Sequence, residues 1–187
     1  MGIILASQSP RRKEILQANG IEFKIIVSDA DETCFEKDPA RLVEILAERK
    51  AAAVSCKASS DDVILSADTI VICDDVILGK PKDRRDAENM LNLLSGNEHR
   101  VITGVCVQMG DKKLISHDVT HVHFKQLTSY EIDEYLDSGE YVDKAGSYAI
   151  QGLGGKFVEK IDGSYTNVVG LPEELTIKLL DEIRTCE

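Results

Sequence analysis

The apolar positions of this chain follow two spacings, one typical of strands and the other of helices. Short runs of apolar and β-branched residues indicate strands. They cover residues 3–6, 23–27, 63–73, 76–78, 99–109, 113–124 and 157–161. The dipeptides Asp74-Asp75 and Gly110-Asp111 each separate two of these runs and suit tight turns, so each pair of runs is expected to form an antiparallel hairpin.

Amphipathic helices are predicted between the strands, because apolar residues recur there every three or four positions. These segments cover residues 10–20, 40–57, 83–94, 128–136 and the chain from Pro172 onward. Ser9 and Pro10 suit the N-cap and the first position of the first helix. The mixture predicts an α/β fold, a mixed twisted sheet with flanking helices, in which residues 1–187 form a single domain.

The charge balance narrows the class of partner. The chain carries 22 lysines and arginines against 33 aspartates and glutamates, a net charge of -11. A protein that binds DNA or RNA needs a broad basic face to neutralise many phosphates, so no nucleic-acid polymer is expected as partner. A small polyanion needs only a local cluster of cations, for which the chain offers Arg11, Arg12, Lys13, Lys50, Lys80 and Lys82.

The cysteines and the apolar segments bear on where the protein works. The five cysteines are dispersed without C-x-x-C spacing, which indicates reduced thiols and neither a disulfide framework nor a zinc knuckle. No segment approaches the ~18 apolar residues of a membrane span, and the start of the chain lacks the pattern of a signal peptide. A cytoplasmic protein with no membrane partner is therefore expected.

The segment Ser7-Gln8-Ser9-Pro10-Arg11-Arg12 places hydroxyls, backbone N–H groups and two guanidiniums at one helix N-terminus. The helix dipole disfavours cations at this end, and a bound phosphate would resolve the conflict. A capped surface helix with solvated arginines explains the same residues equally well. The G-x-x-x-x-G-K-[ST] pattern is missing, which excludes a Walker-type loop.

Carboxylates at two places are candidates for chemistry. Asp68 interrupts the apolar run 63–73, where an unpaired buried charge would be costly. The alternative is an aspartate on the open face of a half-exposed strand. Asp29, Asp31 and Glu32 form an acidic loop that could supply a second ligand to a hard cation, although charge runs are usually solvated.

Two further features are less specific when taken alone. His121 and His123 lie two apart and therefore on one face of a strand, but no third metal ligand has suitable spacing, so a polar strand face is the favoured interpretation. Lys80 follows the run 76–78, and a lone lysine at such a place is usually a surface residue.

Taken together, these segments resemble the Maf family. The resemblance is carried by motifs that follow one another along nearly the whole chain. They are residues 6–12 (ASQSPRR), 48–51 (ERKA), 67–69 (ADT), 79–81 (GKP), 95–96 (SG), 99–105 (HRVITGV), 144–152 (KAGSYAIQG) and 167–172 (NVVGLP).

The resemblance implies two lobes around a central cleft, similar to the inosine-triphosphate pyrophosphatases, and often a homodimer. It also implies an enzyme that uses Mg²⁺ or Mn²⁺ to hydrolyse a nucleoside triphosphate to the monophosphate and pyrophosphate. By matched position, Asp68 is the proton acceptor and, together with Glu32, a metal ligand. The acidic loop is the loosest match, so Asp29 and Asp31 stay alternatives to Glu32. The implied phosphate-binding residues are Ser7, Arg12, Lys50 and Lys80.

Two positions point to the base. Thr69 and Gln151 match the subgroup of the family that acts on dTTP and UTP instead of 7-methyl-GTP, and Arg11 is a further specificity residue of that subgroup. A glutamine amide has both a donor and an acceptor, so it complements the N3–H and carbonyl edge of uracil or thymine. Modified pyrimidine nucleotides are further candidate substrates.

The main alternative is a nucleotide-binding regulator of cell division or septum formation in which hydrolysis is secondary. Retention of Asp68 with Arg12, Lys50 and Lys80 favours an enzyme, because a binding module has no need of an activated water. A purine-specific inosine-triphosphate pyrophosphatase is disfavoured, since that family opens with a motif that contains threonine and asparagine.

Overall fold

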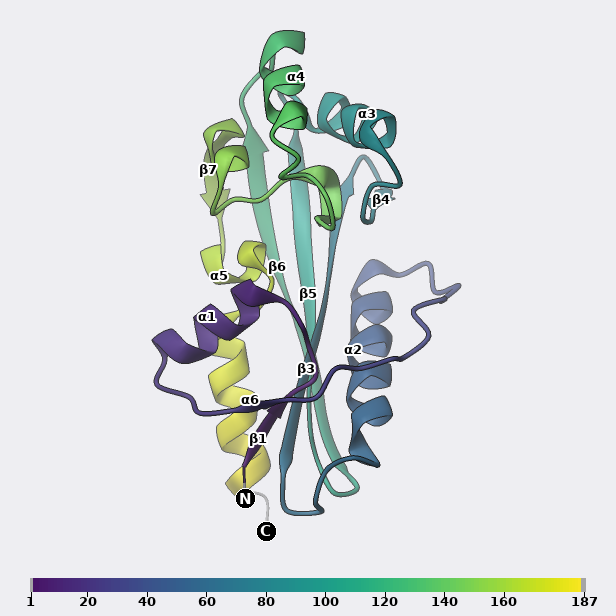
Figure 1. The fold of residues 1–187 in the computed structure, drawn as a ribbon, viewed down its shortest axis with the longest axis vertical. Coiled ribbons are helices and arrows are strands. Elements are labelled where there is room, and N and C mark those ends of the chain that lie inside the picture. The colour runs from purple at the N-terminus through teal and green to yellow at the C-terminus, as the bar shows by residue number, and fades with distance from the viewer. Residues whose placement is uncertain (1, 186–187) are drawn as a thin grey trace. The chain divides into compact units, whose positions relative to one another are not determined.

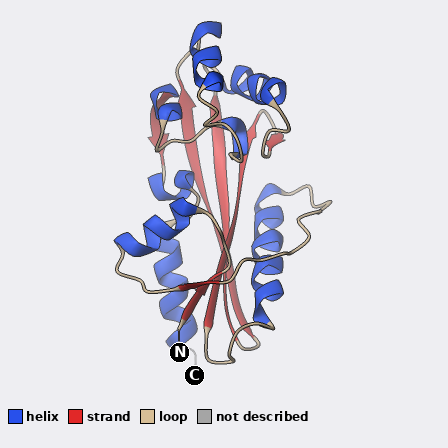
Figure 2. Ribbon diagram, viewed as in Figure 1, coloured by secondary structure: helices blue, strands red, loops and turns tan. Residues whose placement is uncertain are grey.

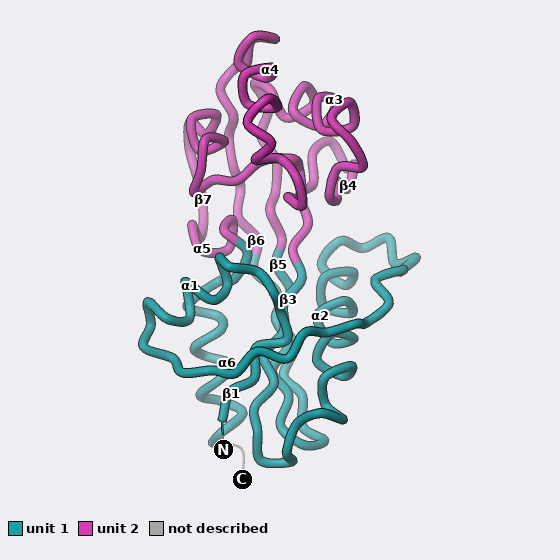
Figure 3. The backbone as a smooth tube through the Cα atoms, in the orientation of Figure 1, with its two compact units in different colours: residues 1–68, 103–118, 170–187 teal, residues 69–102, 119–169 magenta. Residues whose placement is uncertain are grey.

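The computed structural model describes residues 2–185, which divide into two compact units (Figure 3). Unit 1 is Met1–Asp68, Thr103–Asp118 and Gly170–Glu187, and unit 2 is Thr69–Ile102 and Val119–Val169. The single domain and the cleft between two lobes stay predictions.

The strands are β1 (Ile3–Leu5), β2 (Lys24–Ile25), β3 (Val63–Cys73), β4 (Val76–Leu78), β5 (Glu98–Met109), β6 (Lys112–Phe124) and β7 (Val158–Asp162). The sheet has the order β2-β1-β3-β5-β6-β7, with β4 paired to β3 (Figure 1). β1 pairs in parallel with β2 and β3, whereas the β3–β4 and β6–β7 pairs are antiparallel.

The helices are α1 (Pro10–Ala18), α2 (Pro39–Ser55), α3 (Arg84–Leu94), α4 (Ser129–Asp137), α5 (Tyr165–Val169) and α6 (Glu173–Thr185), with two 3₁₀ turns, η1 (Ala145–Ser147) and η2 (Leu153–Phe157) (Figure 2). The predicted α/β fold, a mixed sheet with flanking helices, is confirmed. Within residues 2–185, no helix is long and apolar enough to cross a bilayer.

Unit 1 has helices on both faces of its strands. One apolar core joins alternate strand residues to α2 and contains Ile4, Ala6, Ile64 and Cys106 with Ala47, Ala51 and Val54. The intervening residue Ile3 lies on the other face, where it lines a pocket with Ile177 and Leu180 of α6. Ser66 on β3 ties α2 to the sheet, because its hydroxyl donates to the carbonyl of Ala47 at 2.6 Å.

Unit 2 has its own apolar core under α3 and α4, which pack against each other. Edge-to-face aromatic contacts lie within it, from Phe124 to Tyr148 and to Phe157, and from Tyr135 to Phe157. The His99 ring joins this cluster, and its Nε2 lies 2.8 Å from the hydroxyl of Tyr148. Burial lowers the pKa of His99 to about 4.

Several local predictions can be compared with the structure. Asp74 and Asp75 both have positive φ, as a two-residue hairpin between β3 and β4 requires. Ser9 is the N-cap residue of α1 and Pro10 is its first residue, as predicted, although the Ser9 hydroxyl makes no cap hydrogen bond and its backbone N–H donates to Ser7 Oγ at 3.2 Å. The strand predicted over residues 23–27 is shorter, because β2 pairs only where the three-residue β1 lies beside it.

Candidate active site

A buried ion pair links α2 to β3. Lys50 projects from α2, and its Nζ lies 2.6 Å from Asp68 Oδ1 and 2.9 Å from Glu32 Oε1. The Lys50 and Asp68 side chains are only 14% and 12% exposed, whereas Glu32 is 57% exposed. The costly charge in the apolar strand is thus paired, and the alternative of an aspartate on an open strand face is ruled out.

A second cation, Arg12, is fixed by the start of the chain and by a segment far away in sequence. Its Nε donates to the carbonyl of Gly170 at 2.8 Å, and its Nη1 donates to Ser7 Oγ at 3.2 Å. Gly170 has φ 121°, a conformation that favours glycine. Its motif 167–172 stands out in the sequence, but nothing in the pattern indicates that its carbonyl holds Arg12.

Electrostatics connect the two groups of residues. Burial lowers the pKa of the Arg12 guanidinium from its ordinary value, the negative charge of Asp68 raises it, the charge of Arg11 lowers it, and that of Glu32 raises it. Arg12 therefore lies in the field of the same carboxylates that Lys50 binds. We call Ser7, Arg12, Glu32, Lys50 and Asp68, all in unit 1, the charged cluster.

The other two acids of the loop point elsewhere. The Asp31 carboxylate accepts the backbone N–H of Thr33 at 2.9 Å, which lowers the pKa of Asp31. Asp29, with its side chain 81% exposed, lies 4.0 Å from Lys57. Of the three candidates, Glu32 is the one that reaches Lys50.

Of the remaining predicted residues, Arg11 lies half-buried on α1 in unit 1, whereas Thr69, Lys80 and Gln151 belong to unit 2. Thr69 follows Asp68 on β3 and is half-buried, while Lys80 and Gln151 are exposed. The backbone before Lys80 is held by the carbonyl of Gly79, which accepts the N–H of Gly146 at 3.1 Å. Gln151 lies in the turn in which the N–H of Gly152 donates to the carbonyl of Ala149 at 3.2 Å.

In the charged cluster, the carboxylates of Asp68 and Glu32 both contact the Lys50 ammonium. Two carboxylates are enough to bind a hard metal ion when substrate phosphates supply its other ligands. Residues 2–185 contain no group of three or more histidine, cysteine or acidic side chains arranged to hold a metal. His121 and His123 instead share one carboxylate, since their ring nitrogens lie 2.8 and 3.1 Å from the oxygens of Glu98. The interpretation of this pair as a polar strand face agrees with that contact.

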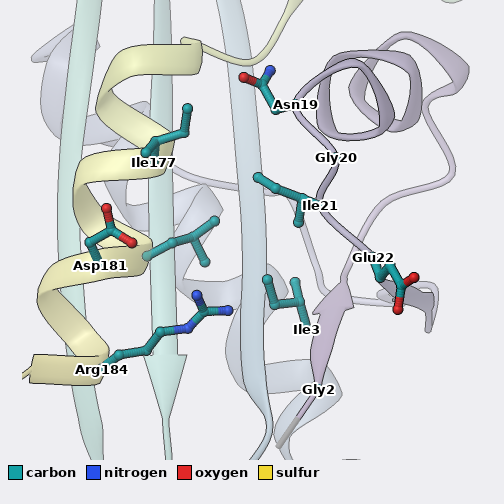
Figure 4. A pocket seen from close by; sticks show the side chains of 10 residues that line it. Gly2, Ile3, Asn19, Gly20, Ile21, Glu22, Ile177, Asp181 and Arg184 are labelled. Atoms are coloured by element: carbon teal, nitrogen blue, oxygen red, sulfur yellow. The ribbon is translucent and has the colours of Figure 1, made fainter.

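A pocket of about 490 Å³ in unit 1 does not coincide with the charged cluster (Figure 4). It lies between β1, the segment that follows α1, and α6, and Ile3, Ile21 and Ile177 line it together with Asp181 and Arg184. None of the predicted site residues lines it.

The four cysteines within the described residues, Cys34, Cys56, Cys73 and Cys106, are free thiols, as predicted. Burial raises the pKa of Cys106 to about 12, which keeps this thiol protonated and unreactive. Cys186 lies outside the described residues.

Comparison with known proteins finds relatives that match most of the chain. A dTTP/UTP pyrophosphatase of Alkaliphilus metalliredigens is 52% identical over 173 residues, which cover 91% of this chain and 90% of the relative. A dTTP/UTP pyrophosphatase of Bacillus pumilus is 48% identical over 96% of this chain and 95% of its own. Among solved structures, a HAM1 protein from Coxiella burnetii covers 99% of this chain and 98% of its own at 16% identity, with a TM-score of 0.48.

The motifs found in the sequence all lie within the range of residues that one protein-family model matches. The model of the Maf-like protein family matches residues 2–183. The chain belongs to the Maf family.

Proposed function

We propose that this protein hydrolyses dTTP and UTP to the nucleoside monophosphate and pyrophosphate with the help of a divalent cation. The observation that carries the proposal is the charged cluster, in which the Lys50 ammonium contacts both Asp68 and Glu32. Family membership and the names of the relatives support the choice of reaction and substrates.

The cations of the cluster have the roles of phosphate ligands. Arg12 and Lys50 neutralise charge on the triphosphate and on the departing pyrophosphate, which is the electrostatic work that dominates phosphoryl transfer. Ser7 orients Arg12 through its hydroxyl oxygen. Lys80, exposed at the end of β4, is a further phosphate ligand.

Asp68 and Glu32 are the residues that would hold Mg²⁺ or Mn²⁺. Their fit rests on the convergence of both carboxylates on one positive group, the Lys50 ammonium. When bound, such an ion polarises the phosphoryl group and lowers the pKa of a water. Asp68 is the residue that would accept the proton of the attacking water, and its Oδ1 lies 2.6 Å from the Lys50 ammonium.

The base is read by Thr69 and Gln151, with Arg11 as a further specificity residue. The exposed amide of Gln151 makes no hydrogen bond with any of residues 2–185, so both its donor and its acceptor are available to a pyrimidine edge. The homodimer and the cytoplasmic location stay predictions.

The test is release of pyrophosphate from dTTP, UTP, GTP, ATP and 7-methyl-GTP at equal concentration. We expect dTTP and UTP to have the highest kcat/KM, because a wrong base leaves polar groups of the site unpaired. Asp68→Asn should remove activity, whereas Asp111→Asn, a change of an exposed aspartate in the β5–β6 turn, should not. Orthophosphate as the first product, full turnover in excess chelator, or 7-methyl-GTP as the best substrate would each contradict a part of the proposal.

The regulator alternative makes a different prediction from the same assay. A nucleotide-binding module would bind dTTP in Asp68→Asn as in the unmodified protein, with negligible pyrophosphate release from either.

A further inference from the structure

The loop that carries Gln151 is built from three glycines whose neighbours come unusually close. A Cβ on Gly154 would lie 3.0 Å from the backbone N and O of Ala149, and one on Gly155 would lie 2.5 Å from the carbonyl oxygen of Ile150. The loop is bounded by two buried aromatic side chains, Tyr148 and Phe157. It is therefore a compact turn with Gln151 exposed on it, and not an extended flexible segment.

One carboxylate outside the loop holds its backbone. Glu140 Oε2 accepts the N–H of Leu153 at 2.9 Å, and Oε1 accepts the N–H of Gly154 at 3.1 Å. Both oxygens are thus used by consecutive peptide groups, directly after the turn that contains Gln151. Charge-assisted hydrogen bonds of this kind are roughly twice as strong as neutral ones.

Gly152, which follows Gln151, makes room for this carboxylate. A Cβ there would lie 2.2 Å from Glu140 Oε2, 2.5 Å from Cδ and 2.6 Å from Oε1. The φ of Gly152 is -113°, outside the left-handed region, and what a side chain at this position would meet is the Glu140 carboxylate.

Glu140 itself is fixed by the end of α4. The helix packs its Ile132, Tyr135 and Leu136 into the core of unit 2. The helix ends at Asp137, and after the C-cap residue Ser138 comes Gly139, with φ 72°, whose N–H donates to the carbonyl of Leu136. Glu140 follows immediately, so its position derives from a packed helix.

We propose that Glu140 is a positioning residue for base selection, which fixes the backbone of the Gln151 turn so that the glutamine amide meets the base in one orientation. The inference rests on the proposed function, in which Gln151 reads the pyrimidine. Glu140 does not contact the base in this account. It acts through the N–H groups of Leu153 and Gly154.

The experiment compares kcat/KM for dTTP and for GTP in Glu140→Gln, which keeps the size of the side chain but replaces one accepting oxygen by an NH₂ group. Loss of one such hydrogen bond should lower the dTTP/GTP ratio about tenfold. Most of the loss should appear as a higher KM for dTTP. Glu134→Gln is the matched control, because Glu134 is exposed on α4, the helix that precedes Glu140, and should leave the ratio unchanged. Partial unfolding would lower both activities equally and leave the ratio as it was.

Two further variants separate the outcomes. Gly152→Ala displaces the Glu140 carboxylate while residue 140 stays a glutamate, and it should lower the dTTP/GTP ratio by a similar factor. Adding Glu140→Gln to Gln151→Ala should produce no further fall, because both changes act on the same contact. A ratio that stays within twofold in both Glu140→Gln and Gly152→Ala, in a protein that does hydrolyse dTTP, overturns this inference alone. A protein that releases no pyrophosphate from dTTP overturns the proposed function and this inference with it.

Discussion

Removal of the Lys50 ammonium would leave Asp68 nearly buried without its nearest counter-charge. At the observed 2.6 Å, the Coulomb attraction at an effective dielectric constant of about 20 is about 6 kcal/mol. The desolvation of both groups offsets much of it, and truncation of one partner of a buried pair typically costs about 3–5 kcal/mol. Because Arg12 also lies in the field of Asp68, we expect the lower end, about 3 kcal/mol, for Lys50→Met.

The assay is urea denaturation at pH 7 in the presence of chelator, on Lys50→Met, Asp68→Asn and the double variant. Asp68→Asn removes the charge that makes the unpaired state costly, so the double variant should be more stable than the sum of the single losses indicates, by about 2 kcal/mol. In a parallel titration with Mg²⁺ in place of chelator, the ion should stabilise Lys50→Met more than the unmodified protein, because it would balance the Asp68 charge that Lys50 no longer balances.

A second ion pair that also joins α2 to a strand, Glu48 on α2 with Lys113 on β6, is the control. Lys113 Nζ lies 2.9 Å from Glu48 Oε1, but these side chains are 33% and 40% exposed, so their coupling should be below about 1 kcal/mol. If the Lys50 and Asp68 losses were additive within about 0.5 kcal/mol, the pair would contribute nothing specific and the reasoning from its burial would be refuted.

Four further predictions follow from single residues. His99 is buried, and its pKa is about 4 in the folded protein against 6.5 in an unfolded chain. Its contribution to stability is therefore complete above pH 6.5 and is lost as the pH falls toward 4. In urea titrations, the free energy of unfolding should fall between pH 7 and pH 5 by about 2 kcal/mol more in the unmodified protein than in His99→Gln. Gly104→Ala should cost about 3 kcal/mol in the same measurement, since its Cβ would lie 2.4 Å from the carbonyl oxygen of Val43. Gly79→Ala, with nothing within 4 Å of its Cβ, should stay within about 0.5 kcal/mol. Arg12→Lys should lower kcat/KM for dTTP about tenfold or more. The reason is that an ammonium cannot keep the guanidinium's hydrogen bonds to Gly170 and Ser7 and also donate to a phosphate. An unchanged kcat/KM would show that Arg12 does not bind the substrate.

The residues that are predictable from the sequence are those whose local surroundings already conflict with their chemistry. Asp68 in an apolar strand requires a partner, so the pattern of residues 63–73 is by itself enough to indicate a site. The identity of that partner is not predictable from local physics, because Lys50 reaches it only through the packing of α2 on β3.

The same limit applies to contacts made by the main chain. The bond from Arg12 to the carbonyl of Gly170 joins residues 158 positions apart, and any residue type has a carbonyl.

The short helical elements α5, η1 and η2 are also absent from the predicted elements, because segments of three to five residues are too short to show a helical period. By contrast, the cap of α4 is predictable, because Thr128 and Glu131 form a capping box within four consecutive residues.

The close approach of Gly104 to Val43 has a consequence for how the charged cluster can vary among related proteins. Val43 and Lys50 lie two helical turns apart and so on one side of α2. The depth of this helix on the sheet is set where the main chain of β5 meets the main chain of α2. The position of the Lys50 ammonium is therefore set by a contact between two backbones. The apolar side chains around that contact can be exchanged for others of similar volume with little movement of Lys50. The core residues can therefore change while the atoms of the charged cluster keep their positions, provided that residue 104 stays a glycine.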